Sequence, residues 1–247
     1  MEEIITLDGK QFLNKKILRT LMYGEGVFET FRYNKKLPKY IKEHHKRLIN
    51  GAKVLNIPPI DFDTYINYIN NTVLKHKNKD LYIKTILVSA GNLYFASKPE
   101  KSHLLVIAKD YIPLEKKEII LTVAPFKRHS SNPLVKIKST NYALNVLAKR
   151  FAEEKGCDDA IFLNENNEIT ETTTANIFWV KGKYLYTPSI DCGLLDGITR
   201  KIILQEAKKE GFTVVEGRFF IKDLKSAHYI FITNALHGII KVKDIML

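Results

Sequence analysis

Residues 159–188, "DAIFLNENNEITETTTANIFWVKGKYLYTP", constrain the fold more than any other part of the chain. Short runs of apolar and β-branched residues alternate there with an Asn-rich turn and a Lys-Gly-Lys turn. This pattern predicts a meander of three or four short strands. With 247 residues and 45% hydrophobic content, the chain is long enough for one large domain or two small ones around such a sheet.

The N-terminal part mixes helices and strands, so the predicted class is α+β. Apolar spacing predicts a helix from about 62 to 74, with Asp63 as its N-cap. Alternating apolar residues predict strands at 81–89 and 103–109.

A polar stretch, "KDYIPLEKKE", marks the expected domain connection. We predict a small α+β domain over 1–110, a connection at 111–117 and a larger domain over 118–247.

Residues 135–150, "VKIKSTNYALNVLAKR", change from alternation to helical spacing. The alternation predicts a strand that carries Lys136 and Lys138 on one face. Beyond it, one face of a predicted helix carries Leu144, Leu147, Ala148 and Phe151. Another helix is expected in "DGITRKIILQEAKKEG", with Gly211 at its C-terminal end.

The net charge of +12 raises the possibility of a nucleic-acid partner. The 39 basic residues are spread over every segment and are mostly lysine, whereas phosphate-reading surfaces cluster charge and favour arginine. We therefore expect no nucleic-acid partner. Apolar runs fall well short of the roughly 20 residues that a membrane span needs, so no membrane association is expected either.

The cysteines, Cys157 and Cys192, are too few for a disulfide framework and are not spaced as a metal site. The first residues, "MEEIITLDGK", lack the apolar core of a secretory signal. Both features lead us to expect a cytoplasmic protein with reduced thiols. His44 and His45 have no acid or cysteine at ligand spacing, so no metal is expected.

The glycines of "YGEGVFETF" do not form a dinucleotide loop. The third glycine of that fingerprint is replaced by Glu29, and a strand follows instead of a helix. A turn into a strand is the simplest interpretation.

Two features could bind an anion. In "DGITRK" a helix begins next to Gly197, and its free amides could hold a phosphate, although an ordinary helix start with Thr199 as N-cap is the commoner outcome for such a pattern. Arg47 lies beside the apolar Leu48 and is either a partly buried anion clamp or a surface arginine.

One acid, Glu171, lies among the threonines of "ITETTTANI". It is either a carboxylate held in place for chemistry or a strand residue that faces water. Together, a lysine, an acid and a phosphate grip match what pyridoxal 5'-phosphate requires: a Schiff base, a partner for the pyridine nitrogen and groups for the phosphate.

The chain resembles the class IV aminotransferase family, the pyridoxal-phosphate enzymes of fold type IV. The resemblance runs nearly end to end through "YGEGVFETFR", "EHHKRL", "KSTNYALNVLAKR", "EITETTTANIFWV", "TPSIDCGLLDGITR" and "FITNALHGI", in the order of the family. It implies a two-domain fold with a small N-terminal α/β domain and a larger C-terminal domain with a β-barrel-like core. It also implies a homodimer that acts on a small-molecule substrate.

Carried over by residue, the resemblance makes Lys138 the catalytic Schiff-base lysine and Glu171 the partner of the pyridine nitrogen. Tyr142 becomes a neighbour of the phenolic oxygen of the cofactor. The glycine turn at 24–26 would line the substrate pocket. The expected phosphate grip consists of Arg47, the amides of Ile198 and Thr199, and the turn at Thr233 and Asn234.

Within the family, "NAL", "CGLL" and "TTAN" resemble the 4-amino-4-deoxychorismate lyases, which form 4-aminobenzoate and pyruvate for folate synthesis. Lyases often carry an arginine before the hairpin glycine, where this chain has Ala90. For substrate contacts we consider Tyr23, Phe28 and Arg128, the last as a carboxylate ligand. The alternatives are an aminotransferase for branched-chain or related amino acids and a non-catalytic basic binding protein on the same fold.

Overall fold

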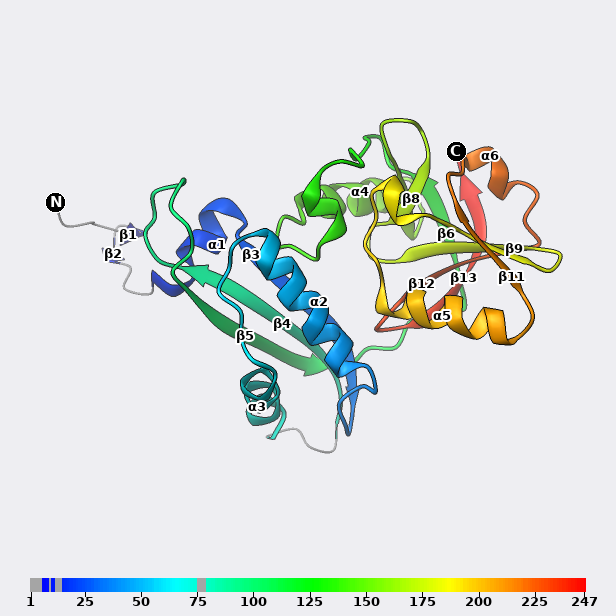
Figure 1. The fold of residues 1–247 in the computed structure, drawn as a ribbon. Coiled ribbons are helices and arrows are strands. Elements are labelled where there is room, and N and C mark those ends of the chain that lie inside the picture. The colour runs from blue at the N-terminus through cyan, green and yellow to red at the C-terminus, as the bar shows by residue number, and fades with distance from the viewer. Residues whose placement is uncertain (1–5, 9, 12–14, 75–78) are drawn as a thin grey trace.

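A three-stranded sheet and an eight-stranded sheet, each with its own helices, lie side by side in the computed structural model (Figure 1). The structure describes residues 6–8, 10–11, 15–74 and 79–247. Ahead of the larger sheets come a two-stranded ribbon and two short helices: β1 (Thr6–Leu7), β2 (Lys10–Gln11), the 3-10 helix η1 (Lys15–Ile17) and α1 (Leu18–Tyr23).

The smaller sheet is antiparallel, in the order β3-β4-β5. Its strands are β3 (Gly26–Asn34), β4 (Asp80–Ala90) and β5 (Lys101–Asp110). Helix α2 (Ile41–Val54) packs against β3, and α3 (Phe62–Val73) packs against β5. The strands expected at 81–89 and 103–109 are thus present and slightly longer than predicted.

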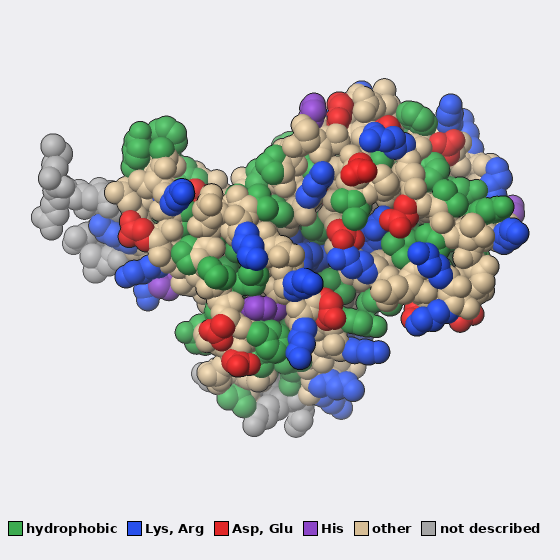
Figure 2. Space-filling view, in the orientation of Figure 1, with side chains coloured by type: hydrophobic (Ala, Val, Ile, Leu, Met, Phe, Trp, Pro, Cys, Tyr) green, Lys and Arg blue, Asp and Glu red, His purple; other side chains and the backbone are tan. Residues whose placement is uncertain are grey.

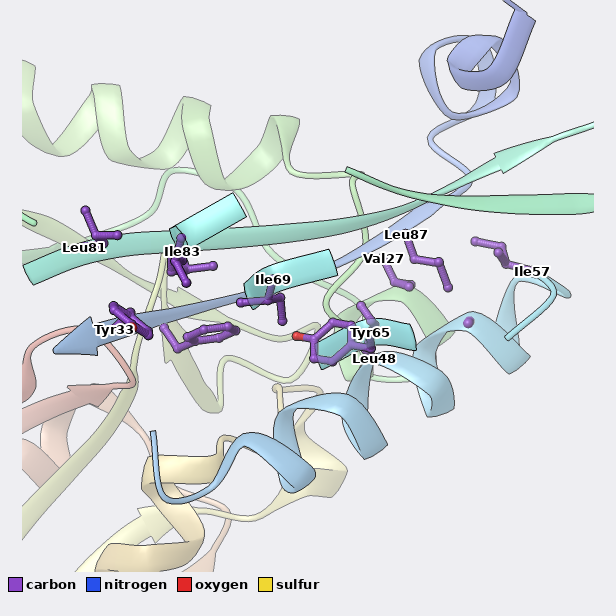
Figure 3. Close-up of a cluster of buried hydrophobic side chains, with 12 residues drawn as sticks. Val27, Tyr33, Leu48, Ile57, Tyr65, Ile69, Leu81, Ile83 and Leu87 are labelled. Atoms are coloured by element: carbon purple, nitrogen blue, oxygen red, sulfur yellow. The ribbon is translucent and has the colours of Figure 1, made fainter. Parts of the chain in front are cut away.

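The core of this part lies between the sheet and the two helices (Figure 3). Side chains on a strand alternate between its faces, so Leu81, Ile83 and Leu87 of β4 all point to the helices. They meet Leu48 of α2 and Ile69 of α3, and all five are almost completely buried. Burial of this apolar surface supplies most of the favourable free energy of folding in such a layer.

Helix α3 is capped by Asp61, so the prediction of Asp63 as N-cap is wrong. The backbone is still extended at Asp61, and its carboxylate accepts the N–H of Thr64 at 2.9 Å. Asp63 already lies inside the first turn, where its negative charge still suits the helix dipole.

The larger sheet has the order β11-β10-β9-β12-β13-β6-β7-β8 and curls around its own core (Figure 1). The sheet is mixed: β10 pairs in parallel with β11, β13 with β6, and β6 with β7, while the other pairs are antiparallel. The strands predicted for 159–188 are confirmed as four, β7 to β10, but they do not form a meander. They pair as two hairpins, β7 with β8 and β9 with β10, which lie apart in the order of the sheet. The strands are β6 (Glu118–Val123), β7 (Asp159–Leu163), β8 (Ile169–Thr172), β9 (Asn176–Lys181), β10 (Tyr184–Pro188), β11 (Thr213–Gly217), β12 (Tyr229–Asn234) and β13 (Gly238–Met246).

Helices around this sheet are α4 (Ala143–Glu154), α5 (Ile198–Lys209) and α6 (Ile221–Leu224), with 3-10 turns η3 (Pro133–Lys136) and η4 (Ile190–Cys192). Gly211 follows α5 with a φ of +82°, the left-handed conformation that glycine adopts without strain, as its predicted place at the helix end requires.

The strand predicted through Lys136 and Lys138 is wrong. Asn132 accepts the N–H of Leu134 at 3.0 Å, and Pro133 supplies the fixed φ that begins a 3-10 turn. Lys136 therefore ends η3 and is exposed, whereas Lys138 follows in an extended segment.

The apolar face predicted for the helix that follows is correct only in part. Helix α4 buries Asn145, Ala148 and Ala152, while Leu144 and Leu147 remain 48% and 50% exposed. The helix is rotated toward its small residues because these allow it to approach β6 and β7 closely.

Residues 111–117 join the two sheets without helix or strand. The hydroxyl of Tyr111 contacts the carbonyl of Leu236, at 3.1 Å, and Nδ1 of His237, at 3.0 Å, which fixes the connection to the turn after β12. The domain boundaries at these residues stay a prediction.

Basic side chains lie scattered among acidic ones on the face shown in Figure 2, without a continuous basic patch. Within the described ranges, no helix is both long enough and apolar enough to cross a bilayer.

Candidate active site

The segment that carries Lys138 is held by the first residues of β3. The N–H of Phe28 donates to the carbonyl of Lys138, and the N–H of Thr140 donates to the carbonyl of Gly26, each at 2.8 Å. Gly26 allows this approach, because a Cβ there would lie 2.9 Å from Cγ2 of Thr140. The glycine turn was expected to line the substrate pocket. Instead, it packs against the segment that carries Lys138 and forms hydrogen bonds with it.

A cavity of about 740 Å³ opens beside Lys138, between β3 and β4 on one side and the larger sheet on the other. Almost every residue predicted for the site lines it. These residues are Phe28, Arg47, Arg128, Lys138, Tyr142, Glu171, Ile198, Thr199, Thr233 and Asn234. Tyr23 is the exception, since it does not line this cavity: its hydroxyl donates to the carbonyl of Leu93 at 2.5 Å and ties α1 to the β4–β5 hairpin.

The surroundings of Lys138 lower the pKa of its amine. Burial, and then the positive charge of Arg47, lower the pKa of Lys138 from 10.5 to about 8. Its Nζ lies 4.3 Å from the ring centre of Phe28 and 5.5 Å from that of Tyr142. A substantial fraction of this amine is therefore neutral near pH 8, the form that can act as a nucleophile or a base.

Tyr142 presents a protonated hydroxyl. Burial, and then the charge of Glu171, raise the pKa of Tyr142. The hydroxyl donates to the carbonyl of Thr173 at 3.2 Å, and the ring meets Phe28 edge to face at 5.2 Å.

Glu171 is held by a cation rather than by its threonine neighbours. Its Oε1 accepts from Nη1 of Arg128 at 2.7 Å, and its Oε2 accepts the N–H of Leu195 at 3.2 Å. Burial raises the pKa of Glu171, and the charge of Arg128 opposes that rise. The interpretation of Glu171 as a strand residue facing water is wrong, because the side chain is buried.

Arg128 was predicted to bind a carboxylate of the substrate. In the structure it binds the carboxylate of Glu171. It is buried, donates to Glu171 and stacks at 3.6 Å over the ring of Phe162. Its charge is thus matched inside the protein. The sequence lacked any signal of this pairing, since 42 residues separate Arg128 from Glu171.

Other residues that line the cavity offer several donors for an anion. Helix α5 begins at Ile198 after Gly197, whose place as N-cap leaves the first amides without a side-chain cap. The hydroxyl of Thr233 is buried there and has no hydrogen-bond partner in the described structure. Buried hydroxyls are rarely left unpaired, so this orphan points to a ligand. Arg47 lines the same cavity.

These groups fit pyridoxal phosphate. A free amine, a buried carboxylate and an anion site with an unpaired hydroxyl face one cavity. Asn234 contributes less directly, because its Oδ1 already accepts the N–H groups of Leu236 and His237 at 3.0 and 2.9 Å. It shapes the turn at the rim.

Lys84, on β4, also lines the cavity and was missed in the sequence. Its Nζ lies 4.3 Å from the ring centre of Phe28, so that ring contacts both Lys84 and Lys138. Burial, and then repulsion by Lys109, lower the pKa of Lys84. Among the described residues no carboxylate forms an ion pair with it. The available signal in the sequence was alternation: Ile83 and Thr85 are buried on one face of β4, so Lys84 between them lies on the other face.

No cluster of His, Cys, Asp or Glu suited to a metal ion occurs in the part of the chain that the structure describes. His44 donates instead to Glu29, and His45 contacts the carbonyl of Ile60 at 2.9 Å.

Known proteins resemble the chain over nearly its whole length. An aminodeoxychorismate lyase of Bacillus subtilis is 31% identical over 228 residues, 89% of this chain and 77% of the relative. A putative branched-chain-amino-acid aminotransferase of Methanocaldococcus jannaschii is 34% identical over 254 residues, 98% of this chain and 87% of the relative. Both relatives are named as enzymes, which argues against a non-catalytic binding protein.

Solved structures agree. A putative 4-amino-4-deoxychorismate lyase of Legionella pneumophila superposes with a TM-score of 0.88 at 32% identity, covering 95% of this chain and 87% of that one. A branched-chain aminotransferase of Thermoproteus uzoniensis gives 0.86 at 25% identity, covering 96% and 85%. These likenesses confirm the predicted α+β fold type IV. The sequence model described as "Amino-transferase class IV" matches residues 26–245, so the chain belongs to the class IV aminotransferase family of pyridoxal-phosphate-dependent enzymes.

Proposed function

We propose that the protein is a 4-amino-4-deoxychorismate lyase that uses pyridoxal phosphate and forms 4-aminobenzoate and pyruvate. The observation that carries the choice is the pair of lysines, Lys84 and Lys138, whose amines each lie 4.3 Å from the ring centre of Phe28 in one cavity. One amine suits proton transfer, and the other is a cation without an acidic partner among the described residues, suited to a substrate carboxylate.

The proposed cofactor site uses the residues that face the cavity. Lys138 would hold the cofactor through Nζ, and Glu171 would pair with its ring nitrogen. Arg47, Thr233 and the amides of Ile198 and Thr199 would hold its phosphate. When bound, pyridoxal phosphate supplies an electron sink for the carbon next to the substrate amine. Tyr142 and Phe28 would keep its ring in place.

Lys138 would then act as the base, because the substrate amine takes its place on the cofactor and releases Nζ as a neutral amine. Its neutral Nζ takes the proton from the ring carbon that bears the substrate amine. The C–O bond to the enolpyruvyl group breaks, enolpyruvate leaves with the bonding electrons and receives that proton, and the ring becomes aromatic. The products contain every atom of the substrate, so the step needs no second reactant.

Lys84 and His237 favour this substrate over an aliphatic one. Both line the cavity, and a pocket for a branched aliphatic side chain is normally apolar. Aminodeoxychorismate carries two carboxylates and a flat ring, which match a cationic wall and the face of Phe28.

An aminotransferase for branched-chain or related amino acids is the second candidate. It is favoured by the 34% identity to the Methanocaldococcus jannaschii relative and by the structural likeness to the Thermoproteus uzoniensis enzyme. It would use the same cofactor residues.

Two assays on the purified protein with pyridoxal phosphate test the proposal. We expect 4-aminobenzoate from aminodeoxychorismate, and no glutamate from leucine with 2-oxoglutarate. Lys138→Ala should abolish the first reaction, and borohydride should attach the cofactor to the wild-type chain alone. Glutamate without 4-aminobenzoate would replace the lyase by the aminotransferase.

We also propose a homodimer. Leu21 and Met22 of α1 are 73% and 53% exposed, and Tyr94 and Phe95 of the β4–β5 hairpin are 62% and 69% exposed. Arg19 joins these elements by donating to carbonyl groups of the hairpin. Hydrophobic side chains gather at this end in Figure 2. A fixed, exposed apolar surface of this kind is typical of a protein interface.

A further inference from the structure

A carboxylate, Glu29 of β3, is buried in the core of the smaller part of the molecule and is fully inaccessible to solvent. It accepts hydrogen bonds from Nε and Nη2 of Arg47 and from Nδ1 of His44, all at 2.7 Å. Because a carboxylate only accepts, His44 carries its hydrogen on Nδ1. The three side chains form one network beside the cavity.

This carboxylate is ionised. Burial alone would raise the pKa of Glu29, but the charge and hydrogen bonds of Arg47 and His44 bring it down to about 2. A buried ion pair seldom adds net stability over apolar packing, because both ions lose their hydration. The location of Glu29 in a core otherwise built from Val27, Phe31 and Leu48 therefore calls for a reason other than stability.

The contacts of Arg47 supply that reason. The two carboxylate oxygens of Glu29 accept hydrogen bonds from Nε and Nη2, which form one edge of the guanidinium. This bidentate contact fixes the plane of the guanidinium. No other acceptor among the described residues bonds to Arg47, and 17% of its side chain stays exposed where it lines the cavity. Nη1 is the nitrogen left for a ligand.

We propose that Glu29 is a positioning residue, which holds Arg47 so that its free edge faces the phosphate of the cofactor, and that His44 keeps Glu29 in place. The proposal rests on the proposed pyridoxal-phosphate site. It also gives the glutamate of "GVFETF" a role that the exclusion of a nucleotide loop left open.

Glu29 could position Arg47 or only neutralise its charge, and these two roles predict opposite effects of removing Glu29 on phosphate binding. If Glu29 only neutralised Arg47, its removal would leave more positive charge at the site and tighten phosphate binding. If it positions the guanidinium, the neutral variant Glu29→Gln loses the bidentate contact, because its amide presents N–H groups to one nitrogen of Arg47. Phosphate binding then weakens.

The experiment compares pyridoxal 5'-phosphate with pyridoxal, which lacks the phosphate. The Kd of each is measured by absorbance titration of the cofactor-free wild type, Glu29→Gln and Glu168→Gln. Glu168 is a matched control: it is buried, pairs with Arg218 at 3.0 Å and does not line the cavity. Thermal unfolding of each cofactor-free protein shows how much of it is folded.

For Glu29→Gln we expect Kd for pyridoxal phosphate to rise about tenfold or more, as for loss of a charge-assisted contact, with Kd for pyridoxal unchanged. Glu168→Gln should change neither. An unchanged or tighter Kd for pyridoxal phosphate overturns the positioning role. So does an equal loss for both ligands, which would mean a structural role. If the wild type itself does not prefer pyridoxal phosphate over pyridoxal, both this inference and the proposed cofactor site fail.

Discussion

Phe28 contacts Lys138 twice: its N–H donates to the carbonyl of Lys138 at 2.8 Å, and its ring lies 4.3 Å from Nζ of the same lysine. One residue of the smaller sheet thus fixes both the backbone and the amine of the residue on which the proposed chemistry depends.

The first prediction concerns the protonation of Lys138. Its pKa of about 8 means that the neutral fraction rises with pH up to about 8 and then levels off. We expect the rate of amine labelling at Lys138 in the cofactor-free protein to rise about tenfold per pH unit below that point and then plateau. Mass spectrometry of digests measures the rate, and the exposed Lys136 supplies the comparison. Parallel profiles for the two lysines would contradict the prediction.

The second prediction concerns Lys84. Lys84→Met removes the cation from the cavity wall but keeps most of the length of the side chain, so kcat/KM for aminodeoxychorismate should fall roughly tenfold to a hundredfold, mostly through KM. Lys101→Met is the control, because Lys101 is exposed and does not line the cavity. Equal kinetics for Lys84→Met and the wild type would remove the carboxylate contact from the proposal.

A third prediction addresses the buried pair of Arg128 and Glu171. Arg128→Met leaves the carboxylate of Glu171 buried without its cation, so the free energy of unfolding should fall by about 3 kcal/mol. Urea unfolding of the cofactor-free protein measures this loss. Adding Glu171→Gln to Arg128→Met should recover part of it, since the uncompensated charge is then gone. A double variant less stable than Arg128→Met would speak against the pairing.

A fourth prediction concerns the β4–β5 hairpin, residues 91–100. Arg19 is completely buried, pairs with Glu25 at 2.7 Å and donates to the carbonyls of Asn92, Tyr94 and Ser97. Arg19→Met should free the hairpin and raise its rate of cleavage by chymotrypsin about tenfold. Arg150→Met, at an exposed site, is the control. If both variants are cut at the wild-type rate, Arg19 does not anchor the hairpin.

The fifth prediction tests the homodimer. Light scattering should give about twice the chain mass of 28.5 kDa for the wild type and a single chain mass for Leu21→Asp. An exposed aspartate disturbs an isolated chain little, but at an apolar interface it loses its hydration. A wild type that elutes as a single chain at every concentration would exclude the dimer.

Residues in local motifs could be predicted from the sequence, and residues that act through distant contacts could not. Lys138 and Glu171 were found because each belongs to a short motif, and both line the cavity. Lys84 looked like any strand lysine, because its neighbour across the cavity lies 54 residues away in the sequence. The role considered for Arg128 changed for the same reason.

Predictions of local structure were wrong where two sequence patterns competed. Alternation predicted a strand through Lys136, but Asn132 and Pro133 favour a tight turn, and the turn formed. Both Asp61 and Asp63 suit a helix start, and the structure places the last extended residue at Asp61, which therefore caps the helix.

The place of β13 in the larger sheet bears on how the protein is made. This strand, Gly238–Met246, lies between β12 and β6 and joins the two halves of the sheet. Strand β6 leaves the ribosome more than 100 residues earlier and cannot pair with β13 until translation has passed residue 246. The three-stranded sheet needs nothing beyond residue 110 and can form first. During synthesis, the part of the cavity wall formed by the three-stranded sheet and α2 would therefore fold first, with Arg47 and Glu29 in place. The part formed by the larger sheet would be complete only after β13 has been made.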